Sequence, residues 1–132
     1  MQNIKNQRFG RQLGITFISL IFMLVIVGMI AMIGIKISPT VIEFMSIKKA
    51  IQSAKQSGAT VREIQIAFDK QAEIGYFDAV AGKDLSIVKT SDGSMDVSFA
   101  YTKKIPLFGP ASLLLEYEGT TAKNGTVPKK QE

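Results

Sequence analysis

Residues 13–35 form an unbroken stretch of apolar and small residues without a charge, and this stretch limits the fold more than any other feature. About 18 or more such residues are enough to cross a hydrocarbon core of about 30 Å as a helix. The rest of this 132-residue chain is too small to surround an apolar helix of that length on every side. We therefore predict a transmembrane helix over residues 13–35, in contact with the lipid bilayer.

The stretch has the features of a permanent anchor more than those of a cleaved signal peptide. The apolar region of a signal peptide spans about 7–15 residues and ends in a small-x-small cleavage site. Here the stretch is longer, and its small residues are paired with large ones, Ala31 with Ile33 and Gly34 with Lys36. The chain has no cysteine, which excludes lipoprotein processing. We expect the helix to stay attached.

Basic residues indicate the orientation of this helix. Lys5, Arg8 and Arg11 precede the stretch with no acidic residue among them. Such flanks stay on the cytoplasmic side of a membrane. The lysines at positions 36, 48 and 49 follow the stretch and weaken this bias. We predict a cytoplasmic tail over residues 1–12 and a domain on the opposite side.

Small residues recur within the stretch at Gly28, Ala31 and Gly34. Their spacing places them on one slowly drifting helix face, where a second helix could approach closely. This face is our candidate helix–helix contact, through which the chain would form a homo-oligomer. The alternative is that glycine and alanine are simply common in membrane helices.

Composition argues against several classes of function. The chain has neither cysteine nor histidine, so it lacks thiolate ligands, the commonest zinc ligand and the commonest general base. We expect no enzyme, no catalytic residues, no cofactor and no metal site. The net charge of +5 comes mainly from the N-terminal flank and a lysine-bearing tail. Without a basic face interleaved with aromatic residues, we expect no nucleic-acid partner.

Two helices are predicted after the stretch. Ser38 and Pro39 have the chemistry of an N-cap and a first turn, and an apolar stripe follows as far as Gly58. The sequence does not decide whether this helix continues the membrane helix or bends away at Pro39. Thr60 and Glu63 form a capping box that begins a second amphipathic helix, which ends near Gly75.

The remaining pattern predicts strands. Residues 84–89 and 96–103 alternate in polarity and are joined by turn residues 91–94, which indicates a β-hairpin. Pro106 and Gly109-Pro110 break the next stretch, and residues 113–117 supply a third strand closed by Gly119. The predicted fold is α+β, with two helices packed on a three- or four-stranded antiparallel meander over residues 36–119. Residues 120–132 are predicted to be a disordered tail.

Three groups of residues were considered as sites. The carboxylates at positions 92, 96, 116 and 118 do not have the spacing of an EF-hand calcium loop, and a solvated turn explains the first two better. Serine–lysine neighbours such as Ser46 with Lys49, and Lys83 with Ser86, are better interpreted as surface residues than as catalytic dyads.

The third group lies in an expected loop over residues 103–112. Its lysines and apolar residues, namely Lys103, Lys104, Leu107 and Phe108, are our candidate partner-binding or membrane-touching surface. The alternative is that Leu107 and Phe108 fold back and cap the core.

The N-terminal segment resembles the start of type IV pilin-like proteins. These have a short basic leader, a glycine before the cleavage point and an apolar helix whose second residue is often threonine. Gly14 and Thr16 match that pattern. The fifth mature residue of the family is a glutamate that pairs with a neighbouring subunit, and here Ser19 takes its place.

A wider resemblance covers residues 14–119. It is carried by Ser38-Pro39-Thr40, Phe68-Asp69-Lys70, Gly82-Lys83-Asp84-Leu85, the segment 97–101 and the segment 105–119. Together these resemble a bacterial family known only as a domain of unknown function, whose members are short single-pass inner-membrane proteins often encoded beside signal peptidase I and ribonuclease III. The resemblance implies an inner-membrane location with a periplasmic α+β domain, and it implies no activity.

The hypothesis that follows is a non-enzymatic anchored protein with a membrane or periplasmic protein partner and an accessory role in the envelope or in export. The alternative is a pilin-like subunit that is processed and polymerises. A hydrolase that uses serine or lysine is the third and weakest option.

Overall fold

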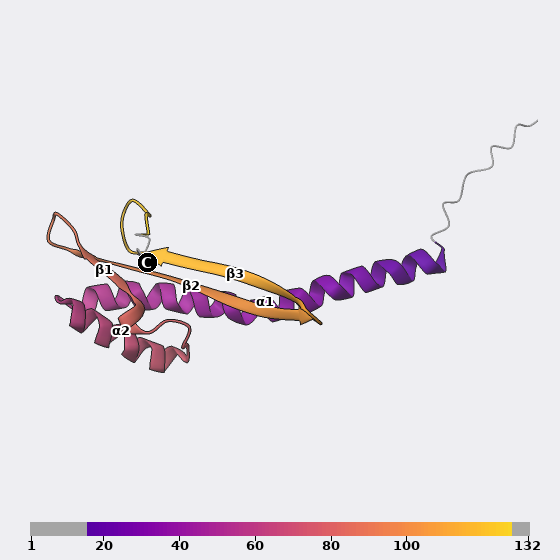
Figure 1. The fold of residues 1–132 in the computed structure, drawn as a ribbon, viewed down its shortest axis with the longest axis horizontal. Helices are drawn as coiled ribbons and strands as arrows, with labels where there is room; N and C mark the ends of the chain where they lie inside the picture. Colours follow the sequence, from indigo (N-terminus) through magenta and orange to yellow (C-terminus); the bar gives the residue numbers. More distant parts are fainter. Residues whose placement is uncertain (1–15, 128–132) are drawn as a thin grey trace, which may run out of the picture. The chain divides into compact units, whose positions relative to one another are not determined.

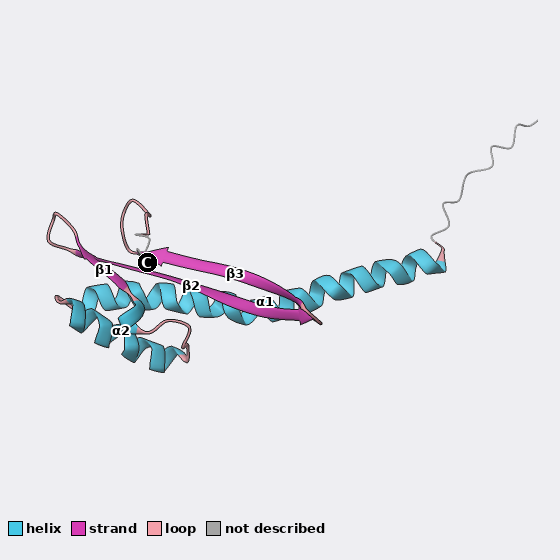
Figure 2. Ribbon diagram, viewed as in Figure 1, coloured by secondary structure: helices cyan, strands magenta, loops and turns pink. Residues whose placement is uncertain are grey.

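The computed structural model describes residues 16–127, which comprise two helices, a short 3₁₀ helix and three strands. The predicted cytoplasmic tail, the cleavage point at Gly14 and the last five residues of the predicted tail lie outside the described residues. The chain divides into two compact units, Met1–Met32 and Ile33–Glu132. Figure 1 and Figure 2 show the order of the elements, and the α+β fold class is confirmed.

Helix α1 spans Phe17–Ser57, and its part in the first unit lies within the apolar stretch. The 18-residue window that defines it has a mean hydropathy of 2.9, and none of that window is buried. Within residues 16–127, α1 is the one helix long and apolar enough to cross a membrane. Its length and composition fit both a membrane anchor and a signal sequence.

The predicted helix start at Ser38 is wrong, because Ser38 and Pro39 lie inside α1. A proline in a helix interior removes one backbone hydrogen bond, so the surroundings must hold the helical turn. Lys36 and Thr40, on either side of Pro39, both contact the sheet through hydrogen bonds. These tertiary contacts outweigh the local capping signal.

Helix α2 spans Val61–Gly75 and begins at the predicted capping box. The Glu63 backbone N–H donates to the Thr60 hydroxyl at 3.3 Å, and the Thr60 backbone N–H donates to the Glu63 carboxylate at 3.2 Å. Hydrogen bonds from the Ala59 and Thr60 backbones hold the pKa of Glu63 below its ordinary value. The helix ends at Gly75, and its C-cap Tyr76 adopts a left-handed conformation with φ 51°. The predicted limits of this helix are confirmed.

The sheet has three antiparallel strands in the order β1-β2-β3. Strand β1 spans Ser86–Lys89, β2 spans Met95–Phe108 and β3 spans Ala111–Thr120. The first hairpin was predicted correctly, but β2 is longer than expected. Pro106 does not end β2, because a bulge between Pro106 and Phe108 accommodates the missing N–H. The expected loop over residues 103–112 is therefore two strand ends joined at Gly109 and Pro110.

One hydrophobic core joins the helices of the second unit to the sheet. Phe68 of α2 and Phe99 of β2 are the largest fully buried side chains. They pack with residues of α1, of α2, of the segment between α2 and β1 and of β2, namely Ile47, Ile51, Ala54, Ile64, Phe77, Val80, Leu85 and Val97. Full burial of such side chains is the main stabilising term for a domain of this size.

Within the second unit, β2 runs antiparallel to α1 along most of its length (Figure 1). Contacts follow in order, from Lys36 with Pro106, through Glu43 with Lys103 and Phe44 with Phe99, to Lys55 with Asp96. The β2–β3 hairpin therefore ends beside Lys36, and the β1–β2 turn lies at the opposite end of this part of α1.

The chain after β3 is held to the sheet at its start. Thr120 still belongs to β3, and the Thr121 backbone N–H donates to the Val97 carbonyl at 2.9 Å. The Thr121 hydroxyl in turn accepts from the Val97 N–H at 2.9 Å. The predicted disordered tail therefore starts too early at residue 120.

Candidate functional site

The four residues predicted as one partner surface lie on two faces of the sheet. Successive residues of a strand point to opposite faces, so Lys103 faces α1 whereas Lys104 faces away from it. The bulge between Pro106 and Phe108 interrupts this alternation before Phe108, which pairs with Ala111 at the turn. Lys103 donates to the Glu43 carboxylate at 3.2 Å, in a half-buried pair that ties β2 to α1. Of the predicted set, Lys104 and Phe108 are the exposed members.

The hairpin tip, residues 106–111, is fixed to α1 by one lysine. The Lys36 ammonium donates to the Pro106 carbonyl at 2.9 Å and to the Leu107 carbonyl at 3.1 Å. These two carbonyls lie at the bulge, where the strand ladder is irregular. The Lys36 side chain thus donates hydrogen bonds to two carbonyls at the point where the hydrogen bonding between β2 and β3 is irregular.

The tip exposes a large apolar side chain. Phe108 is 65% exposed, which excludes the alternative that it folds back to cap the core. Leu114, on the outer face of β3, is 59% exposed. Lys104 of β2 is the cross-strand partner of Leu114 and lies next to it.

An aromatic cluster lies between α1 and the two long strands. The Thr40 and Tyr117 hydroxyls are hydrogen-bonded at 3.0 Å, and the Tyr117 ring stacks on Phe44 with centroids 5.0 Å apart. Tyr101 lies beside Tyr117 at 5.3 Å, and its buried hydroxyl has no hydrogen-bond partner among residues 16–127. Burial, with Glu43 and Tyr117 adding to it, raises the pKa of Tyr101 to about 12.

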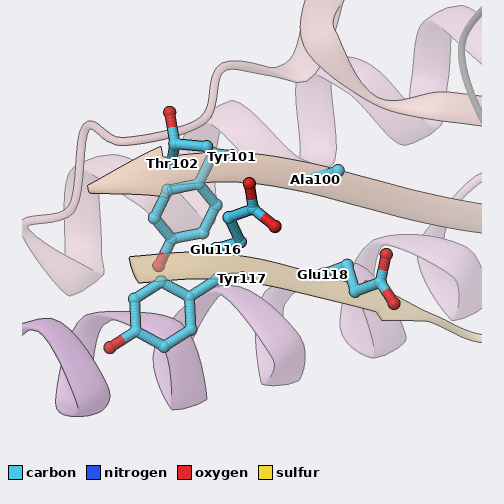
Figure 3. A pocket seen from close by; sticks show the side chains of 6 residues that line it. All are labelled: Ala100, Tyr101, Thr102, Glu116, Tyr117 and Glu118. Atoms are coloured by element: carbon cyan, nitrogen blue, oxygen red, sulfur yellow. The ribbon is translucent and has the colours of Figure 1, made fainter. Parts of the chain in front are cut away.

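A shallow hollow of about 530 Å³ is lined by β2 and β3. Figure 3 shows the residues around it, with Tyr101 and Thr102 from β2 and Glu116 and Glu118 from β3. Both glutamates are exposed and lie on the outer face, opposite the tyrosine rings. Within the described part of the chain, no group of three or more acidic, histidine or cysteine residues could hold a metal ion.

The other two carboxylates considered as ligands have partners in the protein. Asp92 accepts from the Ser94 backbone and hydroxyl, as expected for a turn. Asp96 accepts from the Lys55 ammonium at 2.8 Å and from the Thr90 hydroxyl at 3.0 Å. The Lys55 hydrogen bond, supported by the bond from Thr90, lowers the pKa of Asp96. These two aspartates stabilise the first hairpin.

Two of the sequence motifs meet in space. The Gly82 backbone N–H donates to the Asp69 carboxylate at 2.6 Å, which joins the 3₁₀ helix η1 (Gly82–Asp84) to α2. A Cβ added to Gly82 would lie 2.5 Å from the Gln65 carbonyl oxygen, closer than real contacts allow. The motifs Phe68-Asp69-Lys70 and Gly82-Lys83-Asp84-Leu85 thus build a structural junction.

The small residues proposed for a helix–helix contact are exposed on α1. A Cβ added to Gly28 or to Gly34 meets nothing within 4 Å among the described atoms. Ala31 is exposed as well. Their use by a second helix stays a prediction.

Sequence reasoning missed the α1 residues that position the hairpin. Lys36, Thr40 and Glu43 each contact β2 or β3 from one stretch of α1. Two signals were available, since Lys36 is the first charge after the apolar stretch and Glu43 is the first acidic residue of the chain. Periodicity alone could not identify their strand partners, because those lie about 60–77 positions away.

Comparison with known proteins gives one family. The model of a family described as a domain of unknown function (DUF4845) matches residues 36–117. This range begins at Lys36 and ends within β3, so it contains the hairpin, the aromatic cluster and the Asp69–Gly82 junction. No curated protein and no solved structure matches the chain.

Proposed function

This chain belongs to the DUF4845 family, and we propose that it is a non-enzymatic, single-pass protein anchored in the bacterial cytoplasmic membrane. Its small α+β domain works on the outer, periplasmic side, and residues 1–12 stay in the cytoplasm. The domain acts as an accessory or interaction protein of the envelope, with a membrane or periplasmic protein as its partner.

The observation that carries the proposal is that the two parts of α1 have different surroundings. Its first part is apolar and wholly exposed, a surface that water disfavours and lipid accepts. Its later part supplies Ile47, Ile51 and Ala54 to the core. The helix passes through the end of the apolar stretch without a break. A signal peptidase therefore has no extended segment to cleave there, which supports an anchor over a signal sequence.

Three measurements on the full chain test this proposal. Membranes washed with alkaline carbonate should retain the protein, and the mass of its N-terminus should include Met1. Alkaline phosphatase fused to the C-terminus should be active, because that enzyme works only outside the cytoplasm. Release by carbonate would contradict the anchor, and activity of a reporter restricted to the cytoplasm would reverse the orientation.

The interaction role needs its own experiment. Crosslinking in native membranes, followed by identification of the captured proteins, should return one reproducible partner. A variant that carries an unrelated transmembrane helix in place of residues 13–35 is the matched control. Loss of capture in this control would place the contact on the helix, and retained capture would place it on the domain.

A pilin-like subunit is the second candidate function. It is favoured by an exposed apolar helix that continues into a helix packed on an antiparallel sheet, because subunits that assemble through their helices need such an element. Ser19 argues against it, since its hydroxyl donates to the Thr16 carbonyl at 3.0 Å and offers no charge to a neighbouring subunit. A mature N-terminus at Ile15, especially a methylated one, would favour this candidate over the anchor.

A further inference from the structure

We propose that the β2–β3 hairpin tip, residues 106–111, is a second membrane contact that inserts Phe108 into the surface of the bilayer. This inference rests on the proposed function, because it takes the end of the apolar stretch as the edge of the hydrocarbon core. It adds a lipid-binding site on the folded domain, with phospholipid as the ligand.

The first step concerns where the membrane surface lies. Lys36 is the first charged residue after the apolar stretch, so the hydrocarbon core ends near it. The last apolar turn, residues 33–35, belongs to the same compact unit as the hairpin. Ile35 is 75% exposed there, as expected for a side chain that contacts lipid.

The second step places the tip at that level. Lys36 donates hydrogen bonds to the carbonyls of Pro106 and Leu107, which are the bulged residues just before the turn. The tip is thus fastened to the one residue that marks the edge of the core. A lysine there can place its methylene chain in apolar surroundings while its ammonium stays among polar groups.

The third step is the order of exposed side chains along the hairpin, from its tip outward. Phe108 lies at the tip, the exposed pair Pro106 and Ser112 comes next, then Lys104 with Leu114, and Glu116 and Glu118 lie further away. At about 3.3 Å per residue, Lys104 lies about 13 Å from Phe108 and the row of Glu116 about 20 Å from it. An apolar end, then a cation, then acids is the order that a phospholipid surface selects, since its phosphates attract lysine and repel glutamate.

Charge around the tip supports the same partner. No acidic residue occurs in α1 before Glu43 or in the hairpin between residues 103 and 115. The same two segments contain Lys36, Lys103 and Lys104. Glu43 itself is paired with Lys103. The end of the domain that holds the tip is therefore basic and apolar, whereas the exposed acids lie further along the sheet.

A protein partner at the tip would use the same Phe108, so the test must contain lipid and no other protein. The chain has no tryptophan, so a single introduced tryptophan reports on its position alone. We would compare Phe108→Trp with Val88→Trp, a control on β1, which is 50% exposed. Val88 pairs with Asp96, at the end of the sheet that contacts Lys55 rather than Lys36. Both full-length variants would be reconstituted in vesicles of phosphatidylethanolamine and phosphatidylglycerol.

The measurement is tryptophan emission in vesicles with and without bromine on the acyl chains, which quenches only on contact. Phe108→Trp should lose about half of its emission and shift to the blue, and Val88→Trp should change in neither respect. Leu114→Trp should give an intermediate loss, because it lies further from the tip along β3. This third variant keeps the test valid if Phe108→Trp does not fold.

Two outcomes separate this inference from the proposed function. If the protein remains in carbonate-washed vesicles but Phe108→Trp is quenched no more than Val88→Trp, the tip does not touch lipid and the anchor stands. If carbonate releases the protein, the anchor and with it the inference are wrong. Quenching of Leu114→Trp above that of Phe108→Trp would overturn the proposed order along the hairpin.

Discussion

The Lys36 ammonium and the Pro106 carbonyl, seventy positions apart in sequence, are joined by a hydrogen bond of 2.9 Å. A second bond from the same ammonium reaches the Leu107 carbonyl. Both acceptors belong to the bulge that lets a proline remain within β2. The first charged residue after the apolar stretch is therefore also the residue that fixes the end of the longest hairpin.

Replacing Lys36 by Met should loosen this hairpin end, because the methylene chain is kept while both hydrogen bonds are lost. Hydrogen bonds to charged groups contribute more than neutral ones, and partial exposure reduces the gain, so we expect a loss of about 1 kcal/mol in the free energy of unfolding. Amide hydrogen exchange of residues 107–112 in detergent micelles should rise most. Lys49→Met, at an exposed position of the same helix, should change neither quantity.

The junction between α2 and η1 should tolerate no side chain at Gly82. The Cβ of Gly82→Ala would lie 2.5 Å from the Gln65 carbonyl and 2.9 Å from the Asp69 carboxylate, so η1 must separate from α2. We expect a loss of about 1–3 kcal/mol in the free energy of unfolding, measured by denaturant titration. Lys83→Ala, at the next and exposed position, is the control. Equal stability of the two variants would show that the junction yields without cost.

Tyr101 should ionise later than an ordinary tyrosine. Its pKa is about 12 in the folded protein against 10.0 ordinarily, so above about pH 10 the unfolded chain loses this proton first. The folded state holds the neutral form, and its advantage is therefore lost as the pH rises from about 10 to about 12. Absorbance of tyrosinate in a rapid pH titration of the three tyrosines should show a late component.

Tyr101→Phe should remove that late component at little cost to stability. The hydroxyl that it deletes has no hydrogen-bond partner among the described residues, so we expect a change within about 1 kcal/mol, which includes a small gain. Tyr117→Phe breaks the bond to Thr40 and should cost about 1 kcal/mol in thermal unfolding. A late component that survives in Tyr101→Phe would assign it to another tyrosine.

Local chemistry predicted the elements that depend on nearby residues. The capping box at Thr60 and Glu63 and the turn before β2 are formed by side chains a few positions apart, so their patterns were sufficient. Ser38-Pro39 and Pro106 led to wrong predictions of a helix start and a strand end, because the structure there depends on residues far away in the sequence. At both places a long-range contact from Lys36 or Thr40 maintains the regular structure that the proline opposes. No short-range pattern contains that information.

The candidate surface over residues 103–112 was identified only in part, because its composition is a local feature whereas its strand structure depends on distant residues. The composition of residues 103–112 indicated apolar and basic side chains on one segment, and Phe108 is indeed exposed. A loop has no fixed alternation, whereas a strand does, and treating the segment as a loop grouped Lys103 with Lys104. Because the segment is a strand, Lys103 points to Glu43 and Lys104 lies on the opposite, outer face.

The Asp96–Lys55 pair should make stability depend on pH in the acid range. The Lys55 hydrogen bond lowers the pKa of Asp96 below its ordinary 3.8, so the unfolded chain binds a proton first as the pH falls. The stabilisation is therefore complete above about pH 5 and is lost as the pH falls through 3.8 towards the lowered pKa. Asp96→Asn should lower the free energy of unfolding by about 0.5–1 kcal/mol at neutral pH, because the pair is partly exposed. The difference from the wild type should shrink in denaturant titrations between about pH 5 and pH 3.

Asp78→Asn, at an exposed position after α2, should follow the wild type throughout. A constant difference between Asp96→Asn and the wild type across that range would show that the carboxylate acts without its charge.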